Sequence, residues 1–149
     1  MRVLAMAFIV SLCLVAGYSC SAPKPPVGRW EGTYETQSTM IAARLQIAKD
    51  GTILITAPDM LDIAATGPDD REAIRQRIAS DLAQDWASTQ PRQMSFDGKV
   101  FRKPGGVAPQ LEWNPASKQM TMVVYFGSRP SIEVPLHAVD QFSDDPWPH

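Results

Sequence analysis

The sequence predicts a mainly β protein, with about eight antiparallel strands in a meander or barrel and one inserted amphipathic helix. Short segments of alternating apolar and polar residues recur along the chain, and Asp-Gly and Asn-Pro turn signals separate them. One segment, residues 69–87, instead repeats its apolar residues with a helical period. An α+β arrangement of the same elements is the alternative.

Composition limits the size and the class of the protein. A chain of 149 residues with 44% apolar residues is long enough for one domain with a core of its own. The net charge is −2 and both signs are mixed along the chain, which argues against a nucleic-acid partner held through its phosphates.

The first 19 residues have the pattern of a secretory signal peptide. Arg2 supplies a positive start, residues 3–16 are almost entirely apolar, and small residues follow. The sequence therefore divides into four parts: a signal peptide (1–19), a Pro-rich tether (20–27), a β-rich domain (28–139) and a flexible tail (140–149).

Cys20 directly follows this apolar segment and precedes Ser21 and a Pro-rich spacer. This arrangement resembles the processing site of bacterial lipoproteins, in which the cysteine becomes the lipidated first residue of the mature chain. The resemblance implies an exported protein anchored in the outer membrane through acylated Cys20 and facing the periplasm. The alternative is ordinary cleavage near Ser19, which leaves a soluble periplasmic protein. Cys13 lies inside the signal, so the mature chain forms no internal disulfide.

The opening strand is expected over residues 28–37. Trp30, Gly32 and Tyr34 alternate with polar residues, and Gly32 between two aromatics permits a close approach of neighbouring backbone. Two further strands, 40–49 and 52–57, flank Asp50-Gly51, which favours a hairpin with a type I′ turn. Residues 59–67 are expected to form a loop with one helical turn.

The helix predicted over residues 69–87 carries one apolar stripe. Asp69, followed three residues later by Glu72, resembles a capping box at its start. We expect three arginines to lie on the solvated side: Arg71, Arg75 and Arg77. The stripe that should face the sheet consists of Ile74, Ile78, Leu82 and Trp86.

The second half of the chain returns to strand patterns. Five strands are expected, over residues 93–96, 99–102, 111–113, 119–126 and 131–137. The first two flank a second Asp-Gly turn, and Asn114-Pro115 favours a type I turn before the fourth. Pro135 lies inside the last strand, which predicts an edge strand or a closing strand at a bulge.

The sequence offers no recognisable catalytic, cofactor or metal motif. His137 and His149 are its two histidines, and no nucleophile elbow is present to pair with them. Glu31 and Glu35 share one strand face, but about 13 Å separates them, which exceeds glycosidase spacing and indicates a solvated face. We therefore predict no enzyme, no cofactor and no metal site; an enzyme that uses His137 is a third hypothesis.

Aromatic and methionine side chains on the predicted strands are candidates for an apolar pocket, with plain core packing as the alternative. The pocket candidates are Trp30, Tyr34, Trp113, Met122 and Phe126. A basic cluster around the second hairpin offers a contact for an anionic group of a ligand or lipid, with a solvated hairpin as the alternative. The cluster consists of Arg92, Lys99, Arg102 and Lys103.

The segment from Gly28 to Tyr34, followed by the Asp50-Gly51 hairpin, resembles the start of lipocalin-like domains in small bacterial envelope proteins. The resemblance implies that Trp30 closes the base of a barrel. Together these observations predict an exported, lipid-anchored protein that binds a small apolar or amphipathic ligand. The alternative is an envelope protein–protein module that uses its edge strand or the arginine-bearing helix face.

Overall fold

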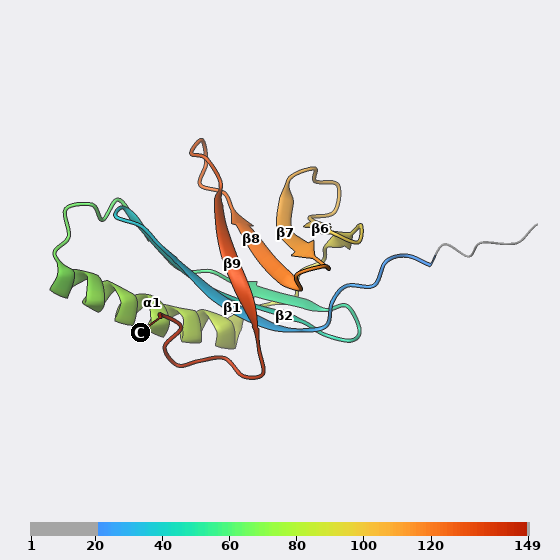
Figure 1. Cartoon of the computed structure of the whole chain (residues 1–149), viewed down its shortest axis with the longest axis horizontal. Coiled ribbons are helices and arrows are strands. Elements are labelled where there is room, and N and C mark those ends of the chain that lie inside the picture. The colour runs from blue at the N-terminus through green and yellow to red at the C-terminus, as the bar shows by residue number, and fades with distance from the viewer. Residues whose placement is uncertain (1–20, 149) are drawn as a thin grey trace, which may run out of the picture.

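The structure, a computed structural model, describes residues 21–148, and the predicted signal peptide and Cys20 lie outside this range. Figure 1 shows a curled antiparallel sheet, open like half a barrel, with one helix against it. This confirms the predicted mainly β fold with an inserted helix. The elements are β1 (Gly28–Glu35), β2 (Thr39–Ile47), β3 (Ile53–Thr56), β4 (Asp59–Leu61), α1 (Pro68–Ser88), β5 (Ser95–Phe96), β6 (Val100–Arg102), β7 (Pro109–Asn114), β8 (Gln119–Val124) and β9 (Ile132–Val139).

The sheet has the strand order β3-β2-β1-β9-β8-β7-β6-β5, and β4 also pairs with β2, beyond the end of β3. The three consecutive strands predicted around Asp50-Gly51 are confirmed as β1, β2 and β3. A backbone bridge links the two ends of this order, because the Arg92 N–H donates to the Ile53 carbonyl at 2.8 Å just before β5. The curled sheet therefore nearly meets itself.

The concave face of the half-barrel holds the main core. Alternating residues of seven strands bury their side chains there, as period-two patterning requires. The buried members are Trp30, Ile41, Ala43, Leu45, Ile47, Ile53, Ile55, Phe101, Leu111, Met120, Met122, Val134 and Leu136. Since most of them have no exposed surface, the middle of the half-barrel is filled by side chains.

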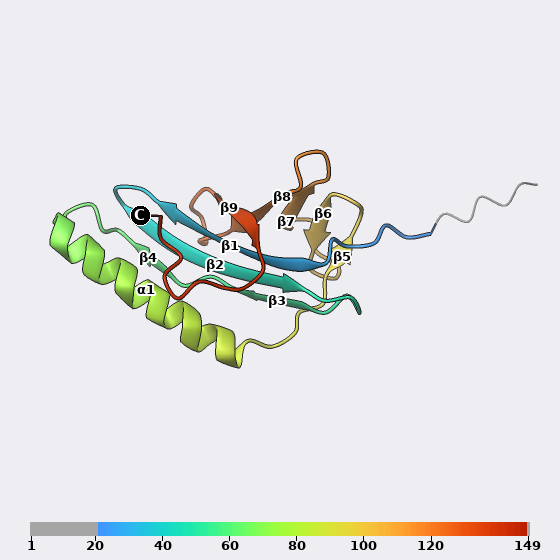
Figure 2. The same ribbon diagram turned by 60° about the horizontal axis from the view of Figure 1, so that its bottom comes forward.

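Helix α1 lies on the convex face, under β2, β3 and β4 (Figure 2). Ile78 and Leu82 are buried there against Met40 and Ala42 of β2, which confirms the predicted apolar stripe. Trp86, at the end of the stripe, instead packs edge-on against Phe142, with 4.6 Å between ring centroids.

The predicted capping box is wrong. Helix α1 begins at Pro68 with Gly67 as its N-cap, and no side chain caps it. Proline suits the first helical turn because its fixed φ matches the helix and its missing N–H needs no acceptor. Asp69 and Asp70 then lie within the first turn, where they interact favourably with the helix dipole.

Two local predictions between β2 and α1 are also wrong. The Asp50-Gly51 hairpin forms, but of these two residues Gly51 alone has a positive φ, 86°, so the turn is not type I′. Residues 59–61, expected in a loop, form β4, which continues beside β2 where β3 ends. Three alternating residues are too few to distinguish a short strand from a loop.

Pro135 lies in β9, which pairs with β1 and β8, and not on an edge strand. The backbone groups of successive residues in a strand point to opposite neighbouring strands. Because the Thr36 N–H donates to Thr39 of β2, the backbone groups of the odd-numbered residues of β1 point toward β9. The β1–β9 register ends at Glu31 opposite His137, which makes Thr33 the residue opposite Pro135. Pro135 has no N–H to donate there, so the ladder stops and the strands diverge (Figure 1).

Gly32 lies where the diverging strands cross. A Cβ at this position would collide with the Pro135 carbonyl oxygen and lie 3.1 Å from the Leu136 Cα. The close backbone approach predicted for Gly32 is therefore confirmed, and it occurs at the point where the sheet curls.

The described part of the tail (140–148), which the sequence predicts to be flexible, contacts the domain at Trp147 and Ser143. Trp147 is 5% exposed on the convex face, and its indole N–H donates to the Arg75 carbonyl at 3.0 Å. The Ser143 N–H donates to Glu31, whose carboxylate also accepts from Arg44 at 3.0 Å. Glu31 is thus half of a buried ion pair, where a solvated face was expected.

Two of the arginines expected on the solvated side of α1 are also engaged. Arg71 and Arg75 both donate to the Glu35 carboxylate, at 2.9 and 2.8 Å. The hydrogen bond from Arg75, followed by that from Arg71, lowers the pKa of Glu35 despite its partial burial. These ion pairs attach the end of β1 to the start of α1.

Candidate functional site

The half-barrel has two distinct ends. Residues 21–27 run along the end where β1 begins, and an added Cβ at Gly98 would lie 3.5 Å from the Pro23 Cβ. Since neighbouring strands are antiparallel, β3, β6 and β8 also begin at this tether end. Their C-terminal ends meet at the opposite end, which we call the mouth. The loops of the mouth are residues 36–38, 57–58, 103–108 and 125–131.

A groove of about 280 Å³ opens at the mouth. Its walls come from β3 on one side and from β7, β8 and the end of β6 on the other, with the segment before β5 between them. We call it the mouth groove. It is lined by Ile55, Thr56, Ala57, Arg92, Met94, Lys103, Gln110, Met122, Val123, Val124 and Tyr125.

Polarity changes with depth in the mouth groove. Met122 and Ile55 belong to the core and are 3% and 8% exposed, while Met94 is half-buried above them. Arg92 and Lys103 are exposed at the rim. Within residues 21–148, neither of these two side chains forms an ion pair or a hydrogen bond. The groove thus combines an apolar floor with a cationic rim.

The predicted basic cluster is divided between sites. Arg92 and Lys103 line the mouth groove, but Arg102 is bound to Asp97 at 2.6 Å. This hydrogen bond, with those from the Val100 and Lys99 backbone N–H groups, lowers the pKa of Asp97 far below its usual range. Arg102 therefore holds the β5–β6 hairpin together.

The five predicted pocket residues all belong to the main core or pack against it, but they do not form one pocket. Met122 lines the mouth groove, and Tyr34 and Phe126 are half-buried side chains packed against the core. Trp30 packs edge-on against Trp113, with 6.2 Å between ring centroids, in the tether half. Trp30 is therefore a packing residue of the core, whereas the half-buried Trp113 also lines a separate groove beside β7 and β8.

Met94 is one of the strand methionines expected to line a cavity, and it lines the mouth groove. Sequence reasoning did not select Ile55 as a groove residue, because Ile55 has the same alternating signal as the other core residue of β3. The convergence of Ile55 and Met94 on Met122 depends on how far the sheet curls, and no local pattern encodes that curl.

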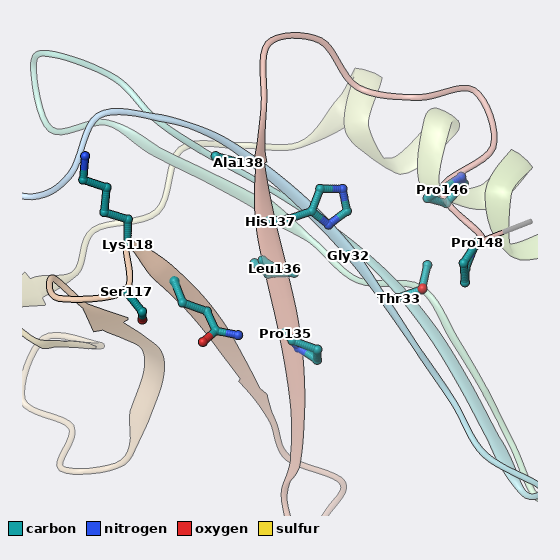
Figure 3. Close-up of a pocket in the computed structure, with 11 residues that line it drawn as sticks. Gly32, Thr33, Ser117, Lys118, Pro135, Leu136, His137, Ala138, Pro146 and Pro148 are labelled. Atoms are coloured by element: carbon teal, nitrogen blue, oxygen red, sulfur yellow. The ribbon is translucent and has the colours of Figure 1, made fainter.

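A second, wider groove of about 640 Å³ lies on the outer side of β9, and Figure 3 shows His137 projecting into it. Thr33 and Pro148 stand on one side of β9, and Ser117 and Lys118 on the other (Figure 3). The His137 imidazole is exposed and makes no hydrogen bond to any described residue. The side chains around His137 therefore form no nucleophile–base pair of the Ser-His or Cys-His kind.

Among residues 21–148, no cluster of three or more His, Cys, Asp or Glu side chains is placed to hold a metal ion. In the same range, no helix has both the length and the apolar character needed to cross a bilayer. No protein-family model matches the chain, and neither a curated protein nor a solved structure shows significant similarity to it.

Proposed function

We propose that this protein is an exported envelope protein, anchored in the outer membrane through acylated Cys20, that binds a small apolar or amphipathic ligand in the mouth groove. It acts in the periplasm as a binding protein and carries out no reaction. The Cys20 signal supports the anchor and the mouth groove supports the ligand.

One observation carries the ligand assignment: apolar side chains from opposite walls of the curled sheet converge on an open groove. The middle of the half-barrel is filled, so the groove at the mouth is the place where a ligand can reach these apolar side chains. Small-molecule sites are concave, mostly apolar and supplied with a few polar groups. A volume of about 280 Å³ fits roughly nine non-hydrogen atoms, at about 30 Å³ for each water-sized atom.

The position of the tether fits this role. Residues 21–27 lie at the end opposite the mouth, where Pro23 is close to Gly98. An anchor at residue 20 would therefore point the mouth away from the membrane surface, toward ligands dissolved or carried in the periplasm.

Native mass spectrometry of the full chain purified from bacterial envelopes tests the proposal. We expect a reproducible extra mass that disappears on denaturation. Met94→Gln should reduce its occupancy because the amide places a polar group in the groove. Met60→Gln is the matched control, since Met60 is a half-buried methionine of the convex face. A ligand-free mass, or equal occupancy in both variants, contradicts the proposal.

A second candidate function, an envelope protein–protein module, is supported by the interrupted β1–β9 ladder. The backbone groups of Thr33 and Glu35 face the gap that Pro135 leaves, and an extended segment of a partner can add to such an edge. A photo-crosslinking residue at position 33 should then capture one partner in cells, whereas the same residue at exposed position 84 of α1 should not.

A further inference from the structure

We infer that the ligand of the mouth groove is a single-chain amphiphile with an anionic head group. Its alkyl chain packs on Ile55, Met94 and Met122, and its head lies between Arg92 and Lys103. This inference rests on the proposed function, because it names the chemical class that the same groove accepts.

The charges of the groove are of one sign. Among the described residues, its lining contains a guanidinium and an ammonium group but no carboxylate. A cationic ligand would meet repulsion at this rim, and a neutral one would leave both charges without a partner. An anionic head group complements both cations, and ligand recognition by complementary charge gives selectivity even where the gain in affinity is modest.

Arg92 is distinctive among the arginines of residues 21–148. Each of the other seven donates to, or forms an ion pair with, a residue of this chain: Arg29, Arg44, Arg71, Arg75, Arg77, Arg102 and Arg129. The Arg92 side chain has no such partner in the described range. A guanidinium has five N–H donors in a planar fork, which matches a carboxylate or phosphate in bidentate geometry.

Backbone contacts place both residues in the groove lining. The Arg92 N–H donates to the Ile53 carbonyl at 2.8 Å, which ties this residue to the edge of β3. Lys103 directly follows β6, where Arg102 is bound to Asp97 and to the Val107 carbonyl. The two cations therefore come from different segments of the groove lining, one before β5 and one after β6.

Octanoate is a suitable probe because it has ten non-hydrogen atoms, close to the groove volume, and is ionised at pH 7. The full chain, purified and delipidated, is titrated with octanoate, 1-octanol and octylammonium, and ¹H–¹⁵N NMR shifts give the affinity and the location. We expect octanoate to bind about tenfold more tightly than octanol, with octylammonium weakest. Octanoate affinity, and not octanol affinity, should fall as ionic strength rises.

Charge-neutralising variants test the two rim residues. Arg92→Gln and Lys103→Gln should each weaken octanoate binding about fivefold and leave octanol binding unchanged, because each removes one exposed ion pair. Lys49→Gln is the matched control, since Lys49 is an exposed cation in the β2–β3 turn at the tether end. It should bind all three probes like the original protein.

The outcomes separate this inference from the proposed function. If octanol and octanoate bind equally well at the groove, the groove binds apolar ligands but the anionic assignment is wrong. If neither binds and no groove resonance shifts, both are wrong. Co-sedimentation with phosphatidylglycerol vesicles that depends on Arg92 and Lys103, without octanoate binding, would overturn the free-ligand assignment in favour of a membrane surface.

Discussion

Replacing Gly32 with alanine should destabilise the fold strongly, because the new Cβ would collide with the Pro135 carbonyl oxygen and press on the Leu136 Cα at 3.1 Å. Both obstacles are backbone, so a side-chain rotation cannot relieve them. Overpacking of this kind costs about 3 kcal/mol, at the upper end of its usual range. Alanine has less conformational freedom than glycine in the unfolded chain, which offsets this cost by roughly 0.7 kcal/mol. The net loss is about 2 kcal/mol.

Thermal unfolding followed by circular dichroism measures this loss. For a domain of this size, about 2 kcal/mol corresponds to a fall in Tm of roughly 6–10 °C. Gly67→Ala is the control, because its added Cβ meets nothing closer than 3.7 Å and its φ of −71° suits alanine. We expect that control to lose less than about 1 kcal/mol. Equal melting temperatures for the two variants would refute the strand-crossing argument.

Three further predictions concern the convex face and its ion pairs. Arg44→Leu should lower the free energy of unfolding in urea by about 3–5 kcal/mol, because it leaves the Glu31 carboxylate buried without its cation. Adding Glu31→Leu should restore much of that stability. A double variant no more stable than the single variant would contradict this prediction. Trp147→Ala should lower the free energy of unfolding by about 3–5 kcal/mol. Trp147→Phe should lower it by about 1 kcal/mol, because only the hydrogen bond to the Arg75 carbonyl is lost. An unchanged Tm in the alanine variant would mean that the tail does not pack. The pKa of Glu35 is lowered in the folded state, so its stabilising effect is present above the unfolded pKa of about 4.3 and is lost as pH falls through the folded value. The free energies of unfolding of the original protein and of Glu35→Gln should then differ by about 0.5–1 kcal/mol at pH 7 and converge near pH 3. Urea titrations at each pH measure this difference. A difference that does not change with pH would exclude the ion pairs as its cause.

Local patterns in the sequence were sufficient to predict most of the elements. Period-two alternation located β1 and β2, and the stripe through Ile78 and Leu82 located α1 and its buried face. These signals are local because each element must bury one face, and the sheet supplies the complementary surface. The close approach at Gly32 was likewise readable from a glycine between two aromatics.

Features that depend on distant residues were not predictable in this way. Glu31 and Arg44 look like solvated charges in the sequence, since nothing near them indicates that Ser143 will cover them. Pro135 indicated an interrupted ladder, but its place between two strands depends on the register of β1 and β9. The mouth groove was missed for the same reason, because it exists only once β3 curls toward β8.

The packing of the tail has a consequence for the order in which the protein folds. Strands β1 and β2 are adjacent in the sequence and can pair early, but their buried ion pair is complete only when Ser143, 112 residues beyond Glu31, arrives. Contacts of such large sequence separation slow folding. Until Trp147 has been synthesised and docked, the hairpin carries a partly solvated ion pair on an uncovered face. A chain truncated before Trp147 would therefore leave this hairpin less covered and would be less stable than the full chain.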